Sequence, residues 1–226
     1  MLPLLAALLF ASCATHKVTE DQDPVKLTAQ AMDAFNRGRY STALEDFKDV
    51  RDQFPFSKYS LLAELKSADA HYYMKEYPEA RVLYQEFESK HPTNEAMSYV
   101  LFQIGMCHFK EIDTIDREPG AAHEAIGVFT RLVRTYPQSS YVVEAKFRVK
   151  AAREFLAEHE LYVARFYLRT GALAAAISRL ELLLAQYPDA NAAPKAEAML
   201  ADARARLAAG PGHGLRAFCQ RFLPFF

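Results

Sequence analysis

The cysteine, histidine and acidic side chains are the residues of this 226-residue chain that could do chemistry, and their spacing decides which chemistry is available. The chain has three cysteines, Cys13, Cys107 and Cys219, and seven histidines. None of them falls in a Cys-x-x-Cys or His-Glu-x-x-His arrangement, the spacings that bring zinc ligands or a metalloprotease base into one site. Three cysteines are also too few for a disulfide framework. The sequence therefore predicts neither a zinc site nor a disulfide scaffold.

The remaining candidates for a reactive or cation-binding site have simpler structural interpretations. Cys107 and His108 lie in an apolar stretch, where a cysteine usually behaves as a small buried hydrophobe. Residues 111–118, EIDTIDRE, gather four carboxylates, which fit a solvated acidic loop better than a cation site. The glycine-rich residues 210–214 have no strand before them to make a phosphate loop, and no Gly-x-Ser-x-Gly nucleophile motif occurs. We expect a protein that is not an enzyme and that holds no metal or other cofactor.

Composition and charge indicate the type of fold and argue against one class of partner. The chain is 51% hydrophobic and 24% charged, with a net charge of −1, which is typical of a soluble globular protein with a core. The near-neutral balance argues against nucleic acid as the main partner, because phosphate binding favours an excess of basic residues. Only eight glycines, together with many Ala, Leu, Glu and Lys residues, favour a helical fold.

The first twelve residues, MLPLLAALLFAS, are apolar and uncharged. They are shorter than the roughly 20 residues that a membrane-spanning helix needs, and they suit the apolar region of a secretory signal, although a packed or disordered N-terminus is the alternative. Residues 10–13 resemble the lipobox of bacterial lipoproteins, with Phe10 where leucine is usual and no Lys or Arg before Cys13. We expect a signal peptide over residues 1–12, a lipid on Cys13 and a polar tether over residues 13–25.

The elements that must position any binding site are repeated helix pairs. Four segments share an aromatic residue or histidine, then a proline, then a polar turn, at Pro55, Pro92, Pro137 and Pro188. Twelve residues before each proline stands an alanine, and eight before it a bulky residue; these are Ala43 and Phe47, Ala80 and Tyr84, Ala125 and Phe129, and Ala176 and Leu180. The pattern is typical of the second helix of a tetratricopeptide repeat. The alanine allows close helix approach, the bulky residue fills the space between repeats, and the proline ends the helix.

The intervals between these prolines locate the insertions. The interval is 37 residues from Pro55 to Pro92, 45 to Pro137 and 51 to Pro188. The first excess falls in residues 110–122, between the helices of the third repeat. The second predicts an extra helix, as two helical stretches or as one long helix with a break near His159, and a capping helix then ends at Gly210. We expect an all-α tetratricopeptide superhelix of about five helix pairs over residues 26–210, followed by a tail over residues 211–226.

Stacked helix pairs form a concave face that holds extended peptides or partner domains. Four blocks, together with the lipobox, resemble the BamD family, the tetratricopeptide lipoproteins of the outer-membrane β-barrel assembly machinery; they are residues 53–60, 91–109, 116–145 and 159–189. The resemblance covers nearly all of the chain after Cys13. It implies a scaffold on the periplasmic face of the outer membrane of a Gram-negative bacterium, with other lipoproteins of the machinery as further partners.

The resemblance also implies two contact regions. Members bind the last periplasmic domain of the barrel protein BamA through their C-terminal repeats, and Arg179 matches a family position in that contact; otherwise it would be an exposed arginine on a helix. The N-terminal repeats receive unfolded outer-membrane proteins, whose C-terminal signal ends in an aromatic residue. The candidate rim of that pocket is Phe54, Phe56, Tyr59 and Ser60, where aromatic rings would stack on the signal. The alternative is that Phe54 and Phe56 pack between repeats.

Two functions from other classes stay open. A periplasmic tetratricopeptide protein that coordinates cell-wall synthesis with envelope constriction would usually carry a coiled-coil region, and no heptad run appears here. A peptidoglycan or sugar enzyme with a helical-repeat body would need paired carboxylates in a cleft, and none can be identified.

Residues 215–222 have helical apolar spacing, which fits either a short helix packed on the last repeat or a docking segment for another lipoprotein or the membrane surface.

Overall fold

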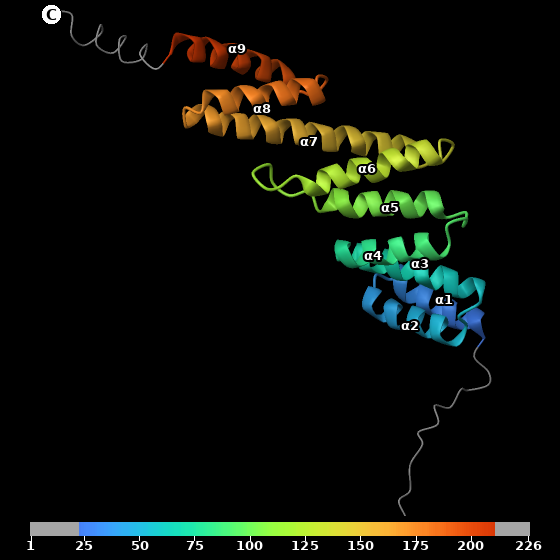
Figure 1. The fold of residues 1–226 in the computed structure, drawn as a ribbon. Coiled ribbons are helices and arrows are strands. Elements are labelled where there is room, and N and C mark those ends of the chain that lie inside the picture. The colour runs from blue at the N-terminus through green and yellow to red at the C-terminus, as the bar shows by residue number, and fades with distance from the viewer. Residues whose placement is uncertain (1–22, 211–226) are drawn as a thin grey trace, which may run out of the picture. The chain divides into compact units, whose positions relative to one another are not determined.

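The structure, a computed structural model, describes residues 23–210. This part of the chain is all-α and contains no strand (Figure 1). Its helices are α1 (Pro24–Asn36), α2 (Tyr40–Gln53), α3 (Lys58–Tyr73), α4 (Tyr77–Lys90), α5 (Met97–Lys110), α6 (Gly120–Thr135), α7 (Val142–Arg169), α8 (Leu173–Gln186) and α9 (Ala193–Ala209). Short turns join the helices in successive pairs, so the predicted tetratricopeptide fold is confirmed.

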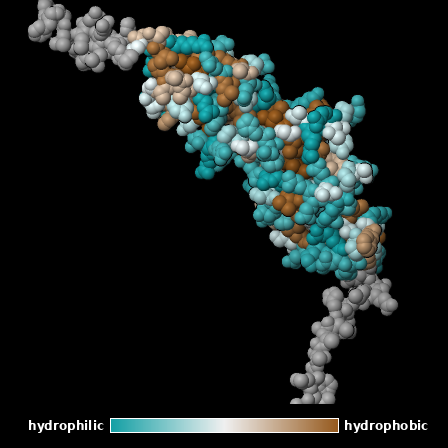
Figure 2. Space-filling model, viewed as in Figure 1, coloured by the Kyte–Doolittle hydropathy of each residue, from teal (hydrophilic) through white to brown (hydrophobic). Residues whose placement is uncertain are grey.

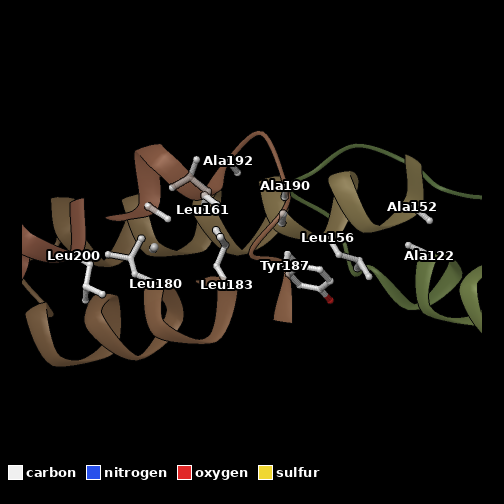
Figure 3. Packing of buried hydrophobic residues seen from close by; sticks show 14 residues of the cluster. Ala122, Ala152, Leu156, Leu161, Leu180, Leu183, Tyr187, Ala190, Ala192 and Leu200 are labelled. Carbon is white, nitrogen blue, oxygen red and sulfur yellow. The ribbon is translucent and has the colours of Figure 1, made fainter. Parts of the chain in front are cut away.

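The chain divides into two compact units, with the boundary between Ala63 and Glu64, inside α3. The first unit has its own core, contributed by α1, α2 and the start of α3, which consists of Ala31, Ala34, Ala43, Phe47, Val50 and Ala63. The second unit contains the rest of α3 and the helices from α4 to α9. Figure 3 shows part of its core, where Leu156 of α7, Tyr187 after α8 and Leu200 of α9 belong to one cluster.

The four repeated prolines follow α2, α4, α6 and α8, and these helices end in the same way. In each, the residue before the proline has φ between −131° and −126° and ψ between 52° and 61°, and its amide donates to the carbonyl four residues earlier. Proline disfavours the helical conformation at the residue before it, which explains the shared geometry. The alanine and bulky positions predicted from the spacing are all fully buried: Ala43, Phe47, Ala80, Tyr84, Ala125, Phe129, Ala176 and Leu180.

Left-handed residues make the turns inside three helix pairs. Gly38 has φ +73° between α1 and α2, and Gly171 has φ +78° between α7 and α8. At the same point between α3 and α4 the chain has Lys75 with φ +65°, a conformation that residues with a Cβ rarely adopt. The third pair differs, because residues 111–119 form the longer connection that the proline intervals predicted.

α7 is one unbroken helix of 28 residues, so both the predicted break near His159 and the two-stretch alternative are wrong. Residues 142–169 contain neither proline nor glycine, and nothing in them interrupts the helical hydrogen bonds. His159 instead contacts the third-repeat loop, with Nδ1 2.7 Å from the carbonyl oxygen of Ile115. α7 projects past α6 beside this loop (Figure 1). The nine helices of the described residues form four pairs and a single last helix, in agreement with the predicted solenoid of about five pairs.

The two ends of the helical region are set by local capping. The Asp23 carboxylate accepts a 2.9 Å hydrogen bond from the amide of Val25, and Pro24 occupies the first turn, so α1 begins two residues before the expected boundary. α9 packs on α8 and is followed by Gly210, with φ +72°, as predicted. The expected signal peptide, Cys13, nearly all of the tether and the tail lie outside the described residues.

None of the helices between residues 23 and 210 combines the length and the apolar composition that crossing a bilayer requires. Figure 2 shows a mainly hydrophilic face, with hydrophobic side chains gathered in several places, including the end of the second unit beside α9.

Candidate partner-binding site

The segment between α2 and α3 in the first unit, residues 54–60, carries the predicted signal-binding residues. The amide of Phe54 donates to the carbonyl of Val50 at 3.0 Å and closes α2. The hydroxyl of Ser57 donates to the carbonyl of Phe54 at 2.8 Å and accepts from the amide of Ser60 at 3.1 Å. Ser57 therefore acts as the N-cap of α3. These bonds hold Pro55 and Phe56 in a short, closed turn.

The four predicted rim residues differ in exposure. Phe56 is fully exposed, so it does not pack between repeats as the alternative interpretation required. Phe54 is half-buried. Tyr59 packs against the core of the first unit, and the Lys58 ammonium lies 5.3 Å from its ring centroid. Ser60 is only 3% exposed. Three aromatic side chains keep exposed surface in this segment, whereas Ser60 lies in the interior.

Arg179 lies on α8 in the second unit, and its charge is not free. Its Nη1 donates to the Glu160 carboxylate on α7, at 3.2 Å to Oε2 and 3.4 Å to Oε1. The Arg179 side chain is 42% exposed and that of Glu160 is 15% exposed. The pair fixes the direction of the guanidinium while leaving part of its donor edge on the surface. This geometry suits recognition of a carboxylate on a partner protein.

Glu160 is the residue at this site that the sequence did not single out. It stands 19 positions before Arg179 on the other helix of an antiparallel pair. The only sequence signal is that the two residues lie at comparable distances on either side of the turn at Gly171. A carboxylate at such a place has no recognisable motif, because many surface positions of the two helices satisfy the same condition.

Two of the four carboxylates in the acidic loop that offered a cation site are paired with arginines. Arg117 contacts Asp113 at 3.1 Å, and Arg81 on α4 forms an ion pair with Glu111. Within residues 23–210 no three His, Cys, Asp or Glu side chains are placed to hold a metal ion. Cys107 is fully buried, and burial raises the pKa of its thiol to about 12. A thiol in that setting is a poor nucleophile, in keeping with its interpretation as a core residue.

The chain was compared with known proteins. A family model described as outer membrane lipoprotein, YfiO, matches residues 20–210. The outer membrane protein assembly factor BamD of Vibrio cholerae is 33% identical over 202 residues, covering 85% of this chain and 84% of the relative. BamD of Neisseria meningitidis serogroup A is 29% identical over 217 residues, covering 88% and 81%. Among solved structures, the TPR2AB domain in the pHSP90 complex of yeast Sti1 has a TM-score of 0.46 at 15% identity, covering 83% of this chain and 72% of that chain.

Proposed function

We propose that the chain is a scaffold of the β-barrel assembly machinery, because it belongs to the YfiO family of outer membrane lipoproteins together with the assembly factors named BamD. In this role it binds the last periplasmic domain of the barrel protein BamA and receives unfolded outer-membrane proteins for insertion. The observation that carries the proposal is the extent of the family match, which covers residues 20–210 and so includes the whole described repeat domain.

The proposed contact with BamA uses Arg179 on α8. Its support is the geometry of the Arg179–Glu160 pair, in which a largely buried carboxylate orients a guanidinium that stays 42% exposed. An arginine held in this way loses less conformational freedom on binding than a free one, so more of its interaction energy remains as affinity. The contact therefore depends on both residues, with Arg179 touching the partner and Glu160 positioning it.

The proposed receiving site for unfolded substrates uses residues 54–60 of the first unit. Its support is the full exposure of Phe56, which leaves the whole ring available to a partner. The exposed ring can stack on the aromatic end of a barrel signal. Phe54 and Tyr59 supply further aromatic surface, while the buried Ser60 contributes to the end of the turn and not to a rim.

The proposed attachment to the membrane is a lipid on Cys13 after removal of residues 1–12. The proposal includes no cofactor besides this covalent lipid. The protein faces the periplasm. Each buried methylene contributes about 0.8 kcal/mol, and two or more acyl chains hold a protein stably. Mass spectrometry of the mature protein tests this step directly, because an unmodified Cys13 would contradict it.

Affinity purification from envelope membranes tests the proposed function as a whole. The full chain, tagged after residue 226, is expected to recover a large β-barrel protein with periplasmic repeats and other lipoproteins. A preparation that contains the tagged protein in the outer membrane but lacks the barrel protein would contradict the scaffold role. Recovery of cell-wall synthesis enzymes in its place would favour the alternative function.

A further inference from the structure

A second candidate binding site lies in the second unit, where α7 passes the turn between α8 and α9. A pocket of about 300 Å³ opens there. Its apolar lining includes Val149 and Ala190 together with Tyr187. Its charged lining has three cations and two carboxylates, which are Lys146, Lys150, Arg153, Glu154 and Asp189. None of these residues belongs to the Arg179 contact or to residues 54–60, so the pocket is a separate feature of the chain.

Three contacts hold the walls of the pocket in place. Arg153 on α7 donates a 2.6 Å hydrogen bond to the carbonyl of Gln186, and its guanidinium lies 5.1 Å from the ring centroid of Tyr187. One position along α7, the Glu154 carboxylate accepts a 2.9 Å hydrogen bond from the amide of Asn191. The turn is therefore fixed to α7 at both ends. A pocket with such walls is formed before a ligand arrives, which lowers the cost of binding.

The cations on the open side of the pocket are not used by the fold. Lys146 and Lys150 stand one turn apart on α7, are exposed, and form no ion pair with any residue between 23 and 210. The carboxylate of Glu154 is already engaged by the Asn191 amide. Another pocket of the same unit is lined by Arg131 and Glu88, and there the two charges neutralise each other at 2.9 Å. The pocket beside α7 thus offers two unpaired lysines, while the exposed Asp189 adds one carboxylate to its lining.

An exposed apolar surface continues from these lysines toward the start of α7. Val143 is 79% exposed and Phe147 is 60% exposed, and they are neighbours at the i, i+4 spacing. Lys146 and Lys150 each lie three residues after one of them, so the cations and the apolar side chains share one face of the helix. Arg148 lies over Phe147, 5.6 Å from its ring centroid, and is itself paired with Glu144.

We propose that this face is a docking site for an extended protein segment in which an aromatic or large aliphatic side chain is flanked by carboxylates. The side chain enters the pocket against Val149 and Ala190, and the carboxylates meet Lys146 and Lys150. The volume supports this assignment, since about 300 Å³ is the lower limit of small-molecule pockets and suits one side chain. The charge supports an acidic segment, because complementary charge sets specificity and encounter rate.

Peptide binding to the full chain tests the site. The probe is a fluorescein-labelled peptide with one phenylalanine between two pairs of aspartates, and binding is followed by fluorescence anisotropy at low salt. Lys146→Glu combined with Lys150→Glu is expected to weaken binding by about tenfold or more, since each reversal replaces attraction by repulsion. Lys195→Glu, an exposed lysine on α9 outside the pocket, is the matched control and is expected to leave the affinity unchanged.

Two further probes make the result decisive. A peptide with lysines in place of the aspartates, and one with alanine in place of the phenylalanine, are each expected to bind more weakly than the first. Amide chemical shifts are expected to change at residues 146–154 and 187–191. Equal affinity for the double variant and wild type, or no preference for the acidic peptide, would overturn the proposal. So would sedimentation showing that wild type self-associates through this face and that the double variant is monomeric.

Discussion

The phenolic hydroxyl of Tyr84 on α4 donates a 2.6 Å hydrogen bond to the buried carboxylate of Asp69 on α3. Tyr99 on α5 donates to the same oxygen at 2.6 Å, and Lys66 contacts the other at 2.7 Å. Gln103 in turn donates to Tyr99 at 2.8 Å. Burial, and then the Asp69 charge, raise the pKa of Tyr84 well above its usual range, so the hydroxyl stays a donor. One carboxylate thereby joins three consecutive helices of the second unit.

Tyr84→Phe is expected to destabilise the protein, because it removes a donor from a buried charge whose lost bond water cannot replace. Hydrogen bonds to charged groups contribute about 1.5–3 kcal/mol, and a loss in that range is expected from urea unfolding followed by circular dichroism. Tyr162→Phe on α7, where the ring is exposed, is the control and should change stability by no more than about 0.5 kcal/mol. Equal effects of the two substitutions would show that the Asp69 bond contributes nothing.

Gly105→Ala on α5 is expected to lower the stability of the protein, and Gly127→Ala on α6 is expected to raise it. A Cβ on Gly105 would lie 2.5 Å from Cε1 of Phe129, whose ring is buried and packs against Phe102. The clash should cost about 1–3 kcal/mol. A Cβ on Gly127 would meet nothing within 4 Å, so alanine there should stabilise α6 by about 0.5–1 kcal/mol. Differential scanning calorimetry would test the pair, and a lower Tm for both variants would contradict the packing argument at Gly127.

The repeat signature could be read from sequence because each of its residues answers a local requirement. Pro55 and its three counterparts fix the conformation of the residue before them, and Ala43 and its counterparts must be small wherever two helices touch. These constraints act within one helix pair, so their spacing survives in the chain. The loop at residues 111–119 was found in the same way, as an excess in one interval.

The continuity of α7 and the details of the candidate sites could not be read in this way. A histidine such as His159 neither breaks nor continues a helix by itself, and its contact with Ile115 comes from a loop 44 residues away. The Arg179–Glu160 pair depends on the relative rotation of two helices, which no periodicity fixes. Phe56 has the same sequence signature whether it is buried between repeats or exposed, and only the turn geometry set by Ser57 decides between them.

His108 is expected to lower the free energy of unfolding as the pH falls below about 6.5, the usual pKa of histidine. Burial, and then the neighbouring Arg81, hold its pKa below that value, although Glu111 and Glu124 oppose them. Between the folded pKa and about 6.5 the unfolded chain binds more protons, so the free energy of unfolding rises with pH across this window. His108→Gln should lessen the difference between urea unfolding at pH 7.5 and pH 5.5.

His123→Gln is the matched control for this pH effect, since His123 is exposed on α6. It should retain the difference in stability that wild type shows between the two pH values. If His108→Gln and His123→Gln reduce that difference equally, the buried setting of His108 is not its cause.

Arg179→Glu is expected to reduce the recovery of the barrel protein from envelope membranes. The substitution places a carboxylate where the proposed contact needs a cation, and it also opposes Glu160. Arg204→Glu is the control for charge reversal, because Arg204 on α9 also forms an interhelical pair, a more exposed one, with Glu181 at 2.7 Å. An exposed pair such as Arg204–Glu181 contributes about 0–1 kcal/mol to stability, so Arg204→Glu should fold. Arg179→Glu leaves the mostly buried Glu160 unpaired, so circular dichroism must first show that this variant is folded. Equal recovery with Arg179→Glu and wild type would remove Arg179 from the contact.

Phe56→Ala is expected to reduce crosslinking to a barrel-signal peptide while leaving stability almost unchanged. Because the ring is fully exposed, its truncation should alter the free energy of unfolding by no more than about 0.5 kcal/mol, so lost crosslinking would report binding alone. Tyr59→Ala cannot separate the two effects, since Tyr59 packs on the core of the first unit. Val25→Ala, at a half-exposed apolar position of the same unit, controls for nonspecific apolar contact. Undiminished crosslinking of Phe56→Ala would place the receiving surface elsewhere, because no other rim residue is as exposed.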